Sequence, residues 1–170
     1  MVATSSVRKT LRGALTGMAA AAGLLIAGAA HADSSGNAQV IELTQIGCQF
    51  VESENGVDHG YQPATADDCR TINSNTSEDR LSKAKVLRLK PGEYVFRVTN
   101  KNVPYQLGFW IRESDYKLGN PVHKLTKTSV SGGGLTLGTT KDYAVNLEPG
   151  EYLYSCPLNP TPNYRLIVEG

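Results

Sequence analysis

The stretch Glu148-Pro-Gly-Glu-Tyr-Leu-Tyr-Ser-Cys-Pro-Leu-Asn-Pro-Thr-Pro-Asn-Tyr-Arg-Leu-Ile-Val-Glu-Gly170 closes the chain and decides the fold. It predicts a tight turn at Pro149-Gly150, because proline fixes φ and glycine tolerates positive φ. A tyrosine-rich strand follows and ends at Cys156. Prolines then prevent regular strand pairing in a short loop. The apolar run Leu166–Val168 predicts a last strand.

Working outward, the rest of the chain shows further β-favouring runs and few helical signals. The run Leu-x-Pro-Gly-Glu-Tyr occurs twice, at Leu89–Tyr94 and Leu147–Tyr152, and predicts two equivalent turns at one end of a sandwich. Additional strands are predicted from β-branched and aromatic residues at Val40–Ile46, Val86–Leu89, Val95–Asn100, Leu107–Ile111 and Thr139–Leu147. About six to eight strands with little helix are typical of an all-β, antiparallel Greek-key β-sandwich.

Two polar excursions interrupt this pattern. The first, Gly47–Ser82, has no sustained apolar period. A structureless insertion of that length is uncommon in a compact domain, so we expect one or two short helical turns there. The second, Arg112–Val130, is predicted to be irregular and to lead into a flexible glycine turn at Ser131–Gly134.

The first 32 residues have the composition of a secretory signal. Arg8, Lys9 and Arg12 precede an uncharged run rich in Ala, Leu and Gly, and Ala30-His31-Ala32 fits a cleavage site. We therefore predict a cleaved signal peptide at residues 1–32, a flexible lead-in at 33–39 and one domain at 40–170. The expected location is periplasmic or secreted, with no membrane contact after cleavage.

The net charge and the number of cysteines limit the classes of function that this protein can have. The formal net charge of the chain is +1, which does not support nucleic-acid binding. The three cysteines would be exported to a compartment that favours disulfides. We predict a disulfide between Cys48 and Cys69, in preference to either pairing with Cys156, because it would tie down the first excursion. Cys156 would then be the free thiol.

From Val86 to Val168 the chain resembles the cupredoxin family. The resemblance rests on the first Pro-Gly turn, on Phe96–Asn100 and on the unit Tyr152–Val168. In that family the terminal loop supplies a cysteine, a histidine and usually a methionine to copper. Here the resemblance places Cys156 in the cysteine position, but it places Tyr105 and Gln106 at the first histidine, Asn159 at the second, and Pro162 and Asn163 at the methionine. A degenerate copper site is therefore implied, without a standard type 1 centre.

Two histidines remain after signal cleavage. Cys156, His59 and His123 are the candidate metal ligands, provided that both excursions fold over the cysteine loop. The alternative is that both histidines are solvated and that Cys156 is a small buried hydrophobe. No cofactor is certain from the sequence, and copper is the one that the resemblance leaves open.

Rigid prolines near Cys156 also suggest a docking surface. Tyr105, Gln106, Asn159 and Tyr164 are predicted to form a partner-docking end, where cupredoxins meet their redox partners. No motif of an enzyme nucleophile and base appears, so we expect a non-enzymatic protein in copper or redox handling or partner binding, with a periplasmic redox or copper-handling protein as the partner. The alternatives are an electron-transfer protein with replaced ligands and a metal-free interaction module.

Overall fold

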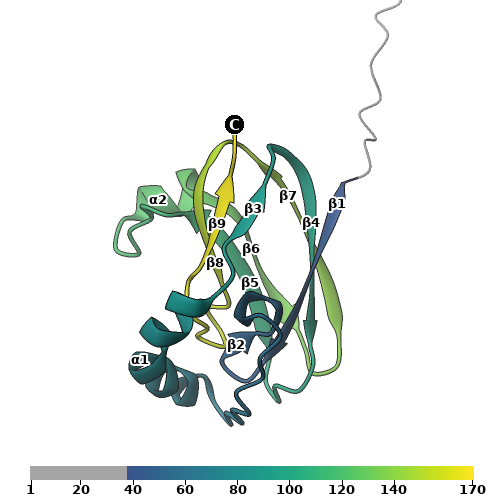
Figure 1. Cartoon of the computed structure of the whole chain (residues 1–170), viewed down its shortest axis with the longest axis vertical. Helices are drawn as coiled ribbons and strands as arrows, with labels where there is room; N and C mark the ends of the chain where they lie inside the picture. Colours follow the sequence, from purple (N-terminus) through teal and green to yellow (C-terminus); the bar gives the residue numbers. More distant parts are fainter. Residues whose placement is uncertain (1–37) are drawn as a thin grey trace, which may run out of the picture. The chain divides into compact units, whose positions relative to one another are not determined.

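The computed structural model describes residues 38–170, and the predicted signal peptide lies outside the described residues. The described residues form two β-sheets around a shared core (Figure 1). The first sheet has the order β2-β1-β4-β7, with the bounds Gln49–Phe50, Gln39–Ile46, Gly92–Asn100 and Thr140–Leu147. The second has the order β3-β9-β8-β5-β6, with the bounds Leu87–Leu89, Tyr164–Val168, Gly150–Ser155, Leu107–Glu113 and Thr128–Leu135. The predicted all-β sandwich is confirmed.

Two strand pairs are parallel, although the sequence predicted an antiparallel arrangement. β1 runs parallel to β4, with Val40 beside Val95, and β3 runs parallel to β9, with Leu87 beside Leu166. A parallel pair needs a long crossover connection. The first excursion provides that connection between β1 and β4, so its length follows from the topology. β1 begins at Gln39, one residue before the predicted domain start.

The core follows the period-two alternation of the strands. On β4 the buried side chains are Tyr94, Phe96, Val98 and Asn100, and their neighbours are more exposed. An aromatic cluster joins the two sheets, with ring centroids 5.3–6.3 Å apart; its members are Phe50, Phe96, Phe109, Tyr143, Tyr154 and Tyr164. All six of these aromatic side chains are buried in the core.

The repeated Pro-Gly turns are equivalent in the structure. The Tyr94 hydroxyl donates to the Lys90 carbonyl at 2.8 Å, and the Tyr152 hydroxyl donates to the Glu148 carbonyl at 2.9 Å. Gly92 also pairs with Leu147, immediately before the second turn. Each turn is therefore closed by the tyrosine of its own motif, and both lie at the same end of the sandwich, as predicted.

Both excursions differ from the sequence prediction. The first contains a 3₁₀ turn at Glu52–Glu54 and one α-helix of 18 residues, α1 (Ala66–Lys83), instead of short helical turns. Thr65 and Asp68 form a capping box at the start of α1, which fixes where the helix begins. The second contains α2 (Pro121–Thr126), and Ser131–Gly134 belongs to β6 and is no free turn. No helix in the described part of the chain is long and apolar enough to span a bilayer.

Candidate functional site

Cys156 follows the last residue of β8 and is fully buried. Its Sγ accepts hydrogen bonds from the backbone N–H of Asn159 at 3.2 Å and of Gly108 at 3.4 Å. Burial raises the pKa of the Cys156 thiol, and these N–H groups act in the opposite direction without cancelling the effect. Cys156 is therefore a protonated thiol at neutral pH. It is the free cysteine of the described residues, as predicted.

Asn159, in the position that the resemblance gives to the second histidine, is a buried junction of hydrogen bonds. Its Nδ2 donates to the Ile46 carbonyl at 3.0 Å. Its Oδ1 accepts from the Cys48 N–H at 3.2 Å and lies 3.1 Å from the Tyr105 hydroxyl. The same oxygen is 2.9 Å from Cys69 Sγ. This amide therefore joins the cysteine loop to the start of the first excursion.

Tyr105, in the position that the resemblance gives to the first histidine, lies on the other side of Asn159. Tyr105, Asn159 and Cys156 are together called the Cys156 corner below. The single hydroxyl proton of Tyr105 lies within reach of Asn159 Oδ1 and of the Thr65 carbonyl, which is 3.2 Å away. Burial raises the pKa of Tyr105 to about 12, with the nearby Cys156 and Asp68 adding to the effect. The phenol is therefore neutral at physiological pH.

A type 1 copper ion does not fit these residues. Such a site needs a thiolate and two imidazole nitrogens, and the corner offers a protonated thiol, a neutral phenol and an amide. Both atoms of the Asn159 amide are already used by backbone groups, so metal binding there would leave the Cys48 N–H and the Ile46 carbonyl without partners. The degenerate copper site implied by the sequence is thus a hydrogen-bonded contact.

The predicted disulfide between Cys48 and Cys69 is present, with Cα atoms 5.0 Å apart. Cys48 has a positive φ of 62°, which is uncommon for a residue with a side chain. Its carbonyl accepts from Asn73 Nδ2 at 3.3 Å and from Arg80 Nη2 at 3.2 Å. The disulfide and these contacts hold α1 against the β1–β2 turn.

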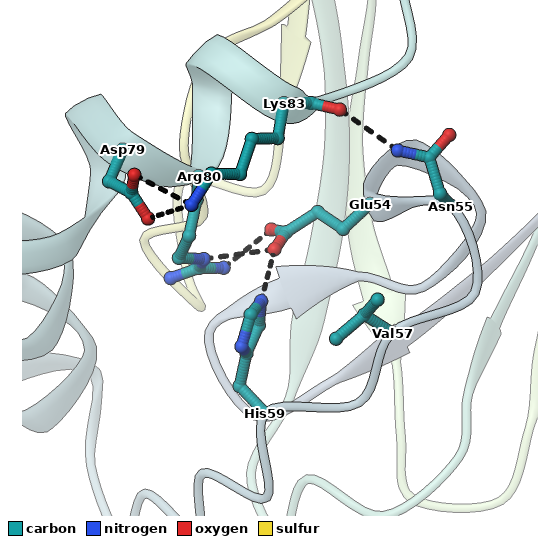
Figure 2. Close-up of a pocket in the computed structure, with 7 residues that line it drawn as sticks. All are labelled: Glu54, Asn55, Val57, His59, Asp79, Arg80 and Lys83. Carbon is teal, nitrogen blue, oxygen red and sulfur yellow. Dashed lines mark hydrogen bonds and ion pairs between the residues drawn. The ribbon is translucent and has the colours of Figure 1, made fainter.

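A buried ion pair lies beside this contact and was not predicted from the sequence (Figure 2). Glu54 Oε1 accepts from Arg80 Nη2 at 2.6 Å and from the Tyr164 hydroxyl at 2.5 Å. Glu54 Oε2 accepts from Arg80 Nε at 3.0 Å and contacts His59 Nε2 at 2.7 Å. Burial alone would raise the pKa of Glu54, but these hydrogen bonds outweigh burial and hold it below its ordinary value.

The pocket drawn in Figure 2 is small, at about 120 Å³. Val57, Asn55 and Lys83 complete its lining, and Lys83 pairs with Asp79 at its rim. Its charged side chains are already paired with one another, so the pocket is the solvent-facing side of a structural network.

The structure does not bring the three candidate metal ligands together. His59 contacts Glu54 and stacks on Tyr61, with ring centroids 5.5 Å apart. His123 lies on α2, where its Nδ1 accepts from the Lys117 N–H at 3.0 Å. Within residues 38–170 no group of three or more His, Cys, Asp or Glu side chains could hold a metal ion. The excursions do not fold as the hypothesis of a Cys156, His59 and His123 site requires.

The predicted docking end is only partly at the surface. Gln106 is exposed and Tyr105 is half-buried, but Asn159 and Tyr164 are fully buried. Tyr164 packs against Phe50 and bonds to Glu54, because it opens β9 and faces the core. The exposed residues of the loop between β8 and β9 are Pro157, Leu158 and Asn163, and none of them was among the four predicted docking residues.

Sequence reasoning also missed Arg80, Asn73 and the structural role of Glu54. Arg80 lies 26 residues from Glu54, in a helix that has no apolar stripe. A buried arginine has no signature in a single sequence, so nothing short of the tertiary contact identifies it.

No protein-family model matches the chain, and no curated protein matches it. Among solved structures, auracyanin B is similar, with 12% identity and a TM-score of 0.43, over 78% of this chain and 90% of that one. Reduced auracyanin from the photosynthetic bacterium Roseiflexus castenholzii is 11% identical, with a TM-score of 0.44, over 78% of this chain and 98% of that one. A laccase from Pediococcus acidilactici is 12% identical, with a TM-score of 0.39, over 79% of this chain but only 28% of the laccase.

These likenesses concern the fold alone. The fold itself is established by the strand topology, in which two sheets face each other and β1 pairs with β4 in parallel. The domain formed by residues 38–170 is therefore a two-sheet β-sandwich.

Proposed function

We propose that this protein is an exported, non-enzymatic cupredoxin-like module that acts by binding a partner without a copper centre. The observation that carries the proposal is the contact between Tyr105 and Asn159. These two side chains stand where the resemblance puts imidazole ligands, and their oxygens lie 3.1 Å apart. A corner that holds copper in a related fold here holds the first excursion to the sandwich.

The remaining surface of the cysteine loop supports a binding role. Leu158 is 43% exposed beside the exposed Pro157. The side chains of Leu158 and Gln106 both lie close to glycines of β6. A Cβ atom built on Gly133 would lie 3.8 Å from Leu158 Cδ1, and one built on Gly134 would lie 3.7 Å from Gln106 Nε2. Leu158 and Gln106 thus border the same glycine-rich part of β6, and they replace Asn159 and Tyr164 in the docking end proposed from the sequence.

A second candidate is copper handling through Cys156, and one observation favours it. Two backbone N–H groups point at Sγ, and such donors stabilise a thiolate if a cation draws the proton away. Cys156 would then bind Cu(I) without the geometry of a blue site. The cupredoxin-like fold makes this copper or redox role worth testing.

Copper titration separates the two candidates. The reduced, processed protein and a Cys156→Ser variant are titrated with buffered Cu(I) and with Cu(II), and retained metal and the visible spectrum are recorded. We expect no stoichiometric retention by either protein and no intense thiolate-to-copper band. Stoichiometric Cu(I) that is lost in Cys156→Ser would establish the handling role and reject the copper-free module.

A further inference from the structure

The most exposed large apolar side chains among the described residues gather on one segment between β5 and β6. Leu125 is 86% exposed, Leu118 is 82% exposed and Val122 is 58% exposed. All three belong to residues 116–126, which include α2 and are called the α2 segment below. In Figure 1 this segment projects to the side of the sheets. Exposed leucines at this density on one projection mark an interaction site.

The charge of the α2 segment has one sign. Lys117 and Lys124 lie beside the leucines, and the segment has no aspartate or glutamate. The nearest acidic residues, Glu113 and Asp115, are already paired with Lys127, whose Nζ is 3.1 Å from Glu113. The free charge around the apolar side chains is therefore positive, and the surface that they meet should be negative.

The base of the segment is rigid and aromatic. The Trp110 and Tyr116 rings meet edge to face, with centroids 5.1 Å apart, and the Arg112 guanidinium lies 4.3 Å from the centre of the Trp110 ring. Arg112 is held in turn by Ser155 Oγ at 3.0 Å. The leucines are thus presented by a fixed support, and little ordering should be needed when they bind.

A second copy of the chain is a poor occupant, because a symmetric contact would bring the two lysines of one copy close to those of the other. An anionic lipid surface fits better. Exposed apolar side chains need no complementary pocket in a fluid interface, and lysines beside them gain from anionic headgroups.

We propose that the α2 segment docks the domain on an anionic membrane surface, with Leu118, Val122 and Leu125 inserted at the interface and Lys117 and Lys124 on the headgroups. This is a peripheral contact, and it departs from the expectation of no membrane contact after signal cleavage. It is independent of the proposed function, since it uses no residue of the Cys156 corner.

Vesicle co-sedimentation tests the proposal. The processed protein is mixed with vesicles of phosphatidylcholine alone and of phosphatidylcholine with an equal share of phosphatidylglycerol. We expect binding to the anionic vesicles that weakens with added salt. Leu118→Asn with Leu125→Asn should reduce it about tenfold or more, and Lys117→Gln with Lys124→Gln should remove the preference for the anionic lipid.

The matched control is Leu137→Asn, which removes a leucine that is 55% exposed but lies outside the segment. It should sediment like the unaltered protein. The proposal is overturned if the unaltered protein ignores anionic vesicles, in which case an acidic protein surface becomes the occupant to test. It is equally overturned if the double leucine variant binds as well as Leu137→Asn.

Discussion

At the scale of single residues, the molecule depends on side chains that sequence patterns do not reveal. Asn159 and Glu54 are both buried and polar, and both have every acceptor atom occupied. When one partner in such a network is removed, each buried polar group that is left without a hydrogen bond costs its full desolvation free energy. In the Cys156 corner, the polar side chains around the sulfur therefore contribute more to the free energy of unfolding than the sulfur itself does.

Glu54→Gln should show this for the buried ion pair. Removing the carboxylate leaves Arg80 buried beside a neutral amide, so the free energy of unfolding at pH 7 should fall by about 3 kcal/mol. The pKa of Glu54 is lowered on folding, so its stabilisation is present above the ordinary value of 4.5 and is lost as pH falls through the folded pKa. The difference between the two proteins in urea denaturation should therefore shrink in acid.

The control is Asp142→Asn, which removes the partner of Arg97 in an exposed pair. This variant should change the stability at pH 7 little, because exposed pairs are screened by solvent. A difference between Glu54→Gln and the unaltered protein that stays constant from pH 7 to pH 3 would contradict the assignment.

At the scale of elements, the strands were predictable and the helices were not. Buried and exposed residues alternate along the strands, and this alternation is visible in the sequence as apolar residues at every second position, as in β4 and β7. α1 buries only Cys69, Asn73 and Arg80, so it has no apolar face for a pattern to detect. It is held by a disulfide and by polar contacts instead. The Ser131–Gly134 part of β6 was predicted to be a turn. Its three glycines have no side chains, so the sequence shows no alternating pattern for this edge strand.

Removing the disulfide should therefore affect α1 first. In Cys48→Ala with Cys69→Ala, the loss of a loop with a sequence separation of 21 should cost about 3 kcal/mol in denaturant unfolding. Amide exchange should rise sharply in α1 and much less in β4 and β7. A reductant should destabilise the unaltered protein and leave the double variant unchanged. Equal exchange increases in all elements would contradict the local role of the crosslink.

At the scale of the whole molecule, the resemblance predicted the architecture. Tyr105, Asn159 and Cys156, which the resemblance places at ligand positions, lie in contact in the structure. The resemblance could not say what fills the Cys156 corner. The answer depends on Cys48, Cys69 and Thr65, which belong to an excursion that the resemblance does not cover. His59 lies in the same excursion, and His123 lies in the second excursion, which the sequence predicted to be irregular, so the positions of the two histidines could not be derived from spacing.

The central claim is that Asn159, which stands where the resemblance places a copper ligand, holds the domain together, and Asn159→His tests it most directly. The stability of this variant in urea and its copper uptake are measured on the same sample. We predict that the free energy of unfolding falls by about 3 kcal/mol, because the Cys48 N–H and the Ile46 carbonyl lose their partner, and that no copper is retained. A variant as stable as the unaltered protein that takes up copper with an intense thiolate band would contradict the account.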